Sequence, residues 1–264
     1  MIVRAKDEAR TIGRTLALLR DQTVRPEIIV VDSGSTDGTL DIARRLSDTL
    51  IEIAPGDFSY GRALNVGARA AAAQVHFAVS AHCFPERSDW VERSLAHYRR
   101  ADVAGTGGAR FLPDGAPLTD VFIQGIEHAR LNPLWGFSNH ASSWRASVWQ
   151  EFPFDEEMPA CEDREWSWRV MSAGWTLAFD PALWVGMSHA WQSAREAYHR
   201  GIVFMPAIDS FADLGPYSAR DALREWWRDV PDSSRSKLLY RLDYRRAAAL
   251  LGKYRGLRSA RRAR

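Results

Sequence analysis

The sequence has few of the features that mark secreted or membrane-spanning proteins. It holds two cysteines in 264 residues, Cys83 and Cys161, and no Cys-x-x-Cys or clustered Cys/His pattern. No apolar run approaches the roughly 18 residues that suggest a membrane span, and the first ten residues, MIVRAKDEAR, turn charged too soon for a signal peptide. We therefore expect free thiols, no structural zinc and a cytoplasmic location.

A second absence concerns carboxylates at the end of one predicted strand. The apolar run VHFAV, residues 75–79, leads into Ser80, Ala81, His82 and Cys83. Many enzymes with a strand and loop of this kind place two carboxylates there to hold a metal. This chain has a serine and a histidine instead, which raises the question of what replaces the acids.

Negative charge is nearly absent from the last thirty residues. Residues 235–264 contain eleven Lys or Arg and one acid, Asp243, whereas the whole chain has a net charge of +2. Such a basic tail attracts anionic surfaces, so one interpretation is peripheral contact with the inner face of a membrane. The other is a solvated helix with a charged end. We expect no nucleic-acid partner.

Apolar runs and helical patterns alternate through the first 111 residues. The predicted strands are residues 1–5, 27–32, 49–54, 75–80 and 103–111. The predicted helices are residues 10–22, 61–73 and 87–100, with one more after the turn GSTDG. Repeated strand–helix units of this kind predict an α/β fold with a parallel, doubly wound sheet. In such sheets, ligands bind beyond the carboxyl ends of the strands.

Polar side chains gather at those strand ends. Lys6, Asp7 and Glu8 follow the first strand, Asp32 and Ser33 follow the second, and the segment PGDFSYGRALN follows the third. Acids, glycines, an arginine and an asparagine at one sheet edge suit a nucleotide with its phosphates and ribose.

The second half of the chain is less regular, but CEDREWSWRVMSAGW predicts a helix over about 162–173. Helical spacing puts one group of side chains on a broad face, with Asp163 beside it: Glu162, Glu165, Trp166 and Arg169. Taken alone, this pattern also fits a charged helix face with a Glu165–Arg169 ion pair. Residues 192–250 are predicted to be largely helical.

Four of these stretches resemble one enzyme family. The stretches are similar, in chain order, to motifs of family 2 glycosyltransferases, in particular the rhamnosyltransferase-like branch: VRAKDEARTIGRTLALL, EIIVVDSGSTDGTLDIA, FSYGRALNVGARAA and CEDREWSWRVMSAGW. The resemblance covers about residues 1–190 and implies the GT-A fold: a Rossmann-like, mostly parallel sheet flanked by helices. It implies a nucleotide-sugar half at 1–111 and an acceptor half at 112–190. A helical C-terminal region with the basic tail, 191–264, matches nothing specific.

The resemblance also implies roles for individual residues. Asp163 would be the general base, and Glu162 would orient it or bind an acceptor hydroxyl. Asp32 would hydrogen-bond the base of the nucleotide. The remaining nucleotide-side residues would be Ala5, Lys6, Glu8, Ser33, Arg62, Asn65 and Ala81. Trp166 and Arg169 would lie on the acceptor side.

The strand end that lacks acids departs from the family pattern. The family usually writes D-A-D-D where this chain has S-A-H-C. Some GT-A relatives use a histidine on the metal at the position of His82, with a second histidine downstream, for which His189 is the candidate. The resemblance therefore allows Mn²⁺ or Mg²⁺ on these two residues. The alternative is a metal-free site in which Arg62 or Lys6 neutralises the donor diphosphate.

These observations predict an inverting glycosyltransferase that uses a nucleoside-diphosphate sugar, with UDP or dTDP sugars favoured by family habit. Two other functions were weighed. A nucleotidyltransferase needs a Gly- and Lys-rich phosphate loop after the first strand, where this chain is acidic. A catalytically inactive nucleotide-binding scaffold fits the missing metal acids but gives no reason for the Glu162–Asp163 pair. The sequence identifies neither the acceptor nor the oligomeric state.

Overall fold

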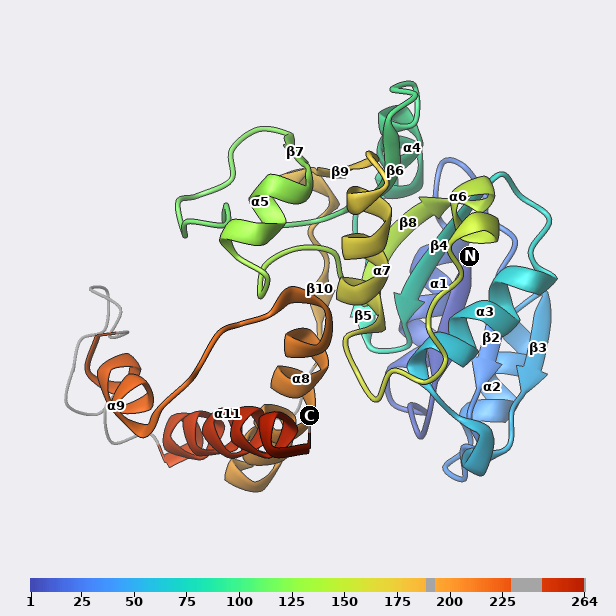
Figure 1. The fold of residues 1–264 in the computed structure, drawn as a ribbon. Helices are drawn as coiled ribbons and strands as arrows, with labels where there is room; N and C mark the ends of the chain where they lie inside the picture. Colours follow the sequence, from blue (N-terminus) through green and yellow to red (C-terminus); the bar gives the residue numbers. More distant parts are fainter. Residues whose placement is uncertain (189–192, 229–243, 264) are drawn as a thin grey trace. The chain divides into compact units, whose positions relative to one another are not determined.

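The computed structural model of the chain describes residues 1–188, 193–228 and 244–263. The chain divides into two units. One comprises residues 1–158 and 162–188, and the other comprises residues 159–161 and 189–264. The first unit contains every strand of the described residues, and the second is helical (Figure 1).

The first unit is built on an eight-stranded sheet with the order β3-β2-β1-β4-β8-β6-β9-β7. Its strands are β1 (Ile2–Ala5), β2 (Ile29–Asp32), β3 (Thr49–Glu52), β4 (Val75–Ser80), β6 (Val103–Gly107), β7 (Phe122–Gln124), β8 (Ala141–Arg145) and β9 (Thr176–Phe179). The first four strands are parallel, and β8 is antiparallel to both of its neighbours. A small antiparallel pair joins β5 (Cys83–Phe84) to β10 (Gly186–Met187). The predicted mostly parallel α/β sheet is confirmed.

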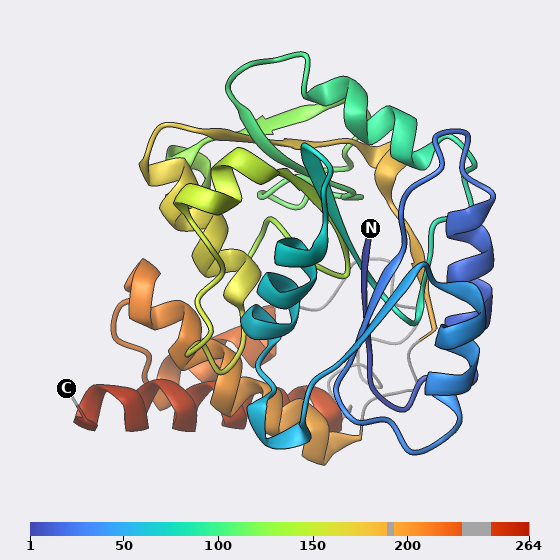
Figure 2. The same cartoon turned by 90° about the vertical axis from the view of Figure 1, so that its right-hand side faces the viewer.

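Helices cover both faces of the sheet. They are α1 (Ile12–Arg20), α2 (Thr39–Leu46), α3 (Tyr60–Ala70), α4 (Trp90–His97), α5 (Ile126–Leu131), α6 (Ala146–Glu151) and α7 (Glu162–Ser172), with short 3₁₀ turns at Pro55–Asp57 and Pro181–Leu183. Figure 2 shows α1 and α2, in blue, on one side of the first strands and α3, in teal, on the other.

Successive side chains along the first strands pack alternately into two separate hydrophobic cores. Ile2 of β1 packs with Leu64 of α3, whereas the next residue, Val3, packs with Leu16 of α1. All of these side chains are fully buried. Strands buried on both faces need apolar residues at every position, which explains the continuous β-branched run in β2.

The register of the first strands brings their carboxyl ends to one edge. Ala5 lies opposite Asp32 in β2, and Arg4 lies opposite Ser80 in β4. The loops that follow these strands therefore start next to one another.

The second unit pairs α8 (Ala194–Ala212) with α11 (Tyr244–Ala263), and α9 (Ala219–Arg228) packs on α11. Glycines allow the close approach of the pair. A Cβ on Gly252 would lie 2.2 Å from the carbonyl oxygen of Tyr198, and one on Gly201 would lie 2.6 Å from the amide nitrogen of Lys253. None of the helices in the described ranges is both long and apolar enough to cross a membrane.

Candidate active site

The turn after β2 is organised by the carboxylate of Asp32. Oδ1 accepts hydrogen bonds from the amides of Gly34 and Ser35 at 2.9 and 2.7 Å, and Oδ2 accepts one from the Ser35 hydroxyl at 2.5 Å. Gly34 adopts φ = 86°, which favours glycine. Asp32 is fully buried. Its carboxylate therefore fixes the turn, whatever it contributes to a bound base.

The loops after β1 and β2 are tied together by hydrogen bonds in both directions. The amide of Asp7 donates to the Ser35 hydroxyl at 2.8 Å, and the amide of Thr36 donates to the Asp7 carboxylate at 2.8 Å. The amide of Glu8 donates to the Thr39 hydroxyl at 2.7 Å. The rim of the predicted nucleotide site therefore consists of two loops that are joined by hydrogen bonds.

The remaining predicted rim residues differ in their exposure. Ala5 and Ser33 are buried and joined by a hydrogen bond from the Ser33 amide to the Ala5 carbonyl at 3.1 Å. Ala81 is also buried. Lys6 is different, because its side chain is 47% exposed while its ammonium group donates to the carbonyl of Gly34. Of these four residues, only Lys6 presents a charged side chain to solvent at this edge.

The strand end that lacks acids carries a carboxylate–imidazole pair. His82 Nδ1 lies 2.6 Å from Glu8 Oε1, and the other oxygen of Glu8 accepts a hydrogen bond from the Thr11 hydroxyl at 2.6 Å. A second imidazole, His140, lies with its ring centroid 6.3 Å from that of His82, and its Nδ1 lies 2.7 Å from the Ser138 hydroxyl. His140 was not among the residues predicted from the sequence, because the strand that follows it has the sequence of an irregular segment.

The described residues supply an incomplete set of metal ligands. His82 can contribute one nitrogen, because its Nδ1 lies 2.6 Å from Glu8 Oε1 and a metal-ligating histidine commonly bonds a carboxylate through its other nitrogen. Burial raises the pKa of the Cys83 thiol to about 12, so it is not a thiolate ligand at neutral pH. No cluster of three or more metal-ligating side chains occurs in residues 1–188, 193–228 and 244–263. His189, the second predicted ligand, lies outside the described residues.

The predicted catalytic pair stands at the start of α7. Asp163 Oδ1 accepts a hydrogen bond from the amide of Arg164 at 2.8 Å, and Oδ2 accepts one from the amide of Asn139 at 3.1 Å. The Arg164 amide belongs to the first turn of α7, and the Asn139 amide comes from the loop before β8. Asp163 is only half-buried, whereas Glu162 is 4% exposed. The more accessible of the two acids is therefore also the one held by main-chain donors.

Glu162 is a buried acid with one cationic neighbour. Burial, and then the nearby charge of Asp163, raise the pKa of Glu162 to about 7, and the guanidinium of Arg4 opposes this rise. Arg4 donates to Glu162 Oε1 at 3.3 Å and to the carbonyl of Asn139 at 3.1 Å. Arg4 was not among the residues predicted from the sequence, because it lies inside a strand and not after its end. Through Arg4, the carboxylate pair is connected to the strand edge that carries the two loops.

The sequence and the fold of the chain are similar to those of known proteins. The profile of the family described as Glycosyl transferase family 2 matches residues 1–155, which is more than half of the chain. The chain belongs to glycosyltransferase family 2.

Two curated relatives are similar in sequence. The O-antigen chain rhamnosyltransferase WbaN of Salmonella anatum is 28% identical over 194 residues, which cover 66% of this chain and 61% of that protein. The glycosyltransferase AglE of Haloferax volcanii is 26% identical over 193 residues, which cover 68% of this chain and 63% of that protein. The chain therefore spans less than two thirds of the length of these relatives.

Solved structures share the fold. The mannosyltransferase PcManGT from Pyrobaculum calidifontis, in complex with GDP-Man and Mn²⁺, aligns with a TM-score of 0.64 at 16% identity and covers 100% of this chain and 74% of its own. The glucosyl-3-phosphoglycerate synthase of Mycobacterium tuberculosis, with Mn²⁺, UDP and glucosyl-3-phosphoglycerate, aligns with a TM-score of 0.60 at 14% identity and covers 81% of this chain and 80% of its own. At these identities the likeness establishes the GT-A fold.

The α3 motif of this family 2 chain has a structural explanation. Asn65 is 2% exposed, and its amide accepts hydrogen bonds from Trp149 Nε1 and the Phe154 amide and donates to the Phe154 carbonyl and the Glu156 carboxylate, all within 2.8–3.1 Å. A Cβ on Gly61 would lie 2.2 Å from the carbonyl oxygen of Asp155. The buried Asn65 amide uses its hydrogen-bonding capacity on protein groups, and the nucleotide contact predicted for it stays a prediction.

Arg62, on the same helix, differs from Asn65 in its exposure to solvent. It is exposed, and its guanidinium makes no hydrogen bond to any of the described residues. Its backbone amide is held by the helix cap, donating to the Ser59 hydroxyl at 3.1 Å. Arg62 therefore stays a candidate for contact with an anionic ligand.

The two predicted acceptor residues are used in packing. Trp166 is fully buried, and its indole N–H donates to the carbonyl of Phe152 at 2.7 Å. Arg169 donates to Glu165 Oε2 at 2.8 Å and to the Pro153 carbonyl at 2.8 Å. No face of the Trp166 ring is accessible in this structure, and its predicted contact with the acceptor stays a prediction. For Arg169, the charged-face interpretation agrees with the observed ion pair.

Proposed function

We propose that the chain is a glycosyltransferase that moves a sugar from a nucleoside-diphosphate sugar to an acceptor hydroxyl, with inversion at the anomeric carbon. The observation that carries this proposal is the Glu162–Asp163 pair. A half-buried carboxylate held by two backbone amides stands beside a fully buried one. A nucleotide-binding scaffold would fit the missing metal acids, but it has no use for such a pair.

The acceptor hydroxyl would attack the anomeric carbon while the nucleoside diphosphate leaves from the opposite face. Asp163 is the residue that takes the hydroxyl proton, because it is accessible and is positioned by two backbone amides. Glu162 would position the acceptor or Asp163, held by Arg4 at 3.3 Å. A single displacement with one carboxylate base inverts the configuration of the sugar.

The leaving diphosphate needs positive charge close to the sheet edge. Lys6 and Arg62 are two of the exposed cations in the segments that follow the first three strands. The donor class is supported by the solved relatives, which hold GDP-Man or UDP. We keep UDP and dTDP sugars as the proposed donors and a cytoplasmic location as part of the proposal. The described residues do not form a complete set of metal ligands, so protein cations are the proposed partners of the diphosphate.

The test compares Asp163→Asn and Glu162→Gln in a transfer assay that measures release of the nucleoside diphosphate from a panel of donors. We expect Asp163→Asn to reduce the transfer rate by about 100-fold or more while donor affinity, measured by calorimetry, stays within about threefold of wild type. Arg164→Gln is a matched control on the same turn. Loss of donor affinity in Asp163→Asn, with the fold intact, would remove Asp163 from the role of base.

The same calorimetry addresses the metal. Titration of UDP is done first in EDTA and then with Mn²⁺ or Mg²⁺, for wild type and for His82→Ala. Binding that needs the metal and is lost in His82→Ala would assign a metal-holding role to His82. Equal binding in EDTA would assign the diphosphate to protein cations, and then Lys6→Met and Arg62→Met should weaken it.

A further inference from the structure

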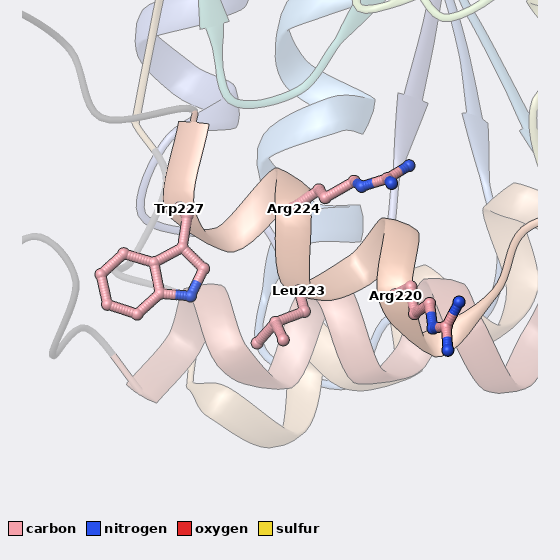
Figure 3. A pocket seen from close by; sticks show the side chains of 4 residues that line it. All are labelled: Arg220, Leu223, Arg224 and Trp227. Atoms are coloured by element: carbon pink, nitrogen blue, oxygen red, sulfur yellow. The ribbon is translucent and has the colours of Figure 1, made fainter.

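The outer face of α9 carries two exposed arginines and two exposed apolar side chains. Leu223 is 60% exposed and Trp227 is 56% exposed, and Arg220 and Arg224 are exposed beside them. The four positions follow helical spacing at i, i+3, i+4 and i+7, so they share one face of the helix. They line an open hollow of about 300 Å³, which Figure 3 shows with the four side chains along α9.

The opposite face of α9 binds the rest of the second unit. Glu225 Oε2 accepts hydrogen bonds from Lys253 Nζ and from the Tyr217 hydroxyl, both at 2.7 Å. The guanidinium of Arg246 lies over the ring of Trp226, 6.0 Å from its centroid. This contact with α11 therefore uses the acidic side of the helix and one tryptophan, and it leaves the basic and apolar side outward.

The arrangement inverts the usual pattern of a helix on a protein surface. Such a helix normally buries its large apolar side chains and exposes charge of both signs. Here the other acid of α9, Asp221, is occupied by the Ser218 hydroxyl and amide at 2.6 and 2.9 Å and lies 3.7 Å from Arg224. The outward face therefore combines positive charge with apolar surface.

The surrounding unit adds to this charge. Residues 193–228 and 244–263 contain twelve Lys or Arg and five Asp or Glu, and α11 has no acid at all. A second protein that covered the face would need an acidic, apolar surface of matching shape. An anionic bilayer meets the same requirement without shape matching, since its headgroups pair with arginine while Trp and Leu enter the interface.

We propose that the outer face of α9, formed by Arg220, Leu223, Arg224 and Trp227, docks the protein on an anionic lipid surface. This assigns membrane contact to a defined face of one helix and not only to the basic tail predicted from the sequence. The docking is independent of the sugar-transfer reaction, so the failure of either proposal leaves the other standing.

The experiment is co-sedimentation of the full chain with vesicles of phosphatidylcholine alone or with added phosphatidylglycerol. Wild type should bind only the anionic vesicles, and less tightly at high salt. Leu223→Ser/Trp227→Ser should weaken binding by about tenfold or more, and Arg220→Gln/Arg224→Gln by about fivefold for each arginine removed. All four side chains are exposed, so the variants should keep the unfolding transition of wild type.

Matched controls lie on exposed positions of the first unit. Leu131→Ser, at a leucine that is 84% exposed, and Arg93→Gln/Arg99→Gln should leave vesicle binding unchanged. The proposal is overturned if wild type ignores anionic vesicles or if the Leu223/Trp227 variant binds them as wild type does. It is also overturned if light scattering shows a dimer that this variant alone dissociates, because the face would then be an interface between two copies.

Discussion

Asn65 offers a direct test of whether the α3 motif binds nucleotide or supports the fold. In Asn65→Ala, the Trp149 indole N–H and the amide and carbonyl of Phe154 lose their partner, whereas Glu156 keeps its ion pair with Arg69 at 3.3 Å. An unpaired buried polar group costs about 1–3 kcal/mol. Because the segment can partly relax into the vacated space, we expect a loss of about 3–5 kcal/mol in the free energy of unfolding.

The assay is urea unfolding of wild type, Asn65→Ala and Arg62→Ala, followed by calorimetric titration of each folded protein with UDP. Arg62→Ala is the control on the exposed side of the same helix, and we expect its stability to stay within about 0.5 kcal/mol of wild type. Nucleotide affinity should fall in Arg62→Ala and should be largely kept in Asn65→Ala at temperatures where that variant is folded.

The opposite pattern would refute the reasoning. If Asn65→Ala lost less than about 1 kcal/mol of stability and its UDP affinity fell sharply, Asn65 would be a ligand contact. The hydrogen bonds to Trp149 and Phe154 would then contribute little, and the motif would act as the family resemblance first implied.

Three further predictions concern buried acids and a buried histidine. The pKa of Glu162 is raised from 4.5 to about 7, so the native state binds this proton more tightly than the unfolded state and its contribution to stability falls as pH rises from 4.5 to 7. Glu162→Gln should abolish that loss, which is on the order of 3 kcal/mol at most. Equal pH slopes of the unfolding free energy for wild type and variant, measured in urea, would contradict this prediction. Burial lowers the pKa of His76 from 6.5 to about 4, so wild type should lose stability as pH falls through this window and His76→Leu should lose less, measured as unfolding free energies at pH 7 and 4.5. Asp32→Ala should weaken UDP binding by about 1–3 kcal/mol, with Ser35→Ala as the control that keeps the carboxylate, and unchanged affinity would exclude Asp32 from base recognition.

The first four strands were predictable from the sequence because each is a short, largely apolar run. β1, β2 and β4 are buried almost throughout, whereas β3, at the edge of the sheet, is only half-buried. β8 was not predictable, since its sequence ASSWR looks like a loop. Ser143 is nevertheless fully buried, because its hydroxyl lies 2.7–2.8 Å from those of Ser94, Tyr98 and Thr106. A polar residue that finds its partners on distant segments gives no local signal of burial. For that reason the antiparallel insertion, and His140 just before it, appeared only in the structure.

The candidate site was predictable where chemistry depends on adjacent residues. Glu162 and Asp163 are neighbours in the chain, so their pairing could be read directly. Arg4 could not be found this way, because it is separated from Glu162 by 158 positions and meets it only when β1 and the start of α7 come together. An arginine inside an otherwise apolar strand was the one available signal.

Burial separates the motif residues that can contact a ligand from those that support the fold. Asn65 holds residues 154–156 through the Phe154 carbonyl and the Glu156 carboxylate, in the segment that precedes the Glu162–Asp163 pair at the start of α7. Trp166 anchors the same connection through the carbonyl of Phe152. Asp163 is half-buried and keeps its proposed role. Asn65 and Trp166 are buried and support residues 152–156, so the ligand roles that the resemblance implies for them are the first to test.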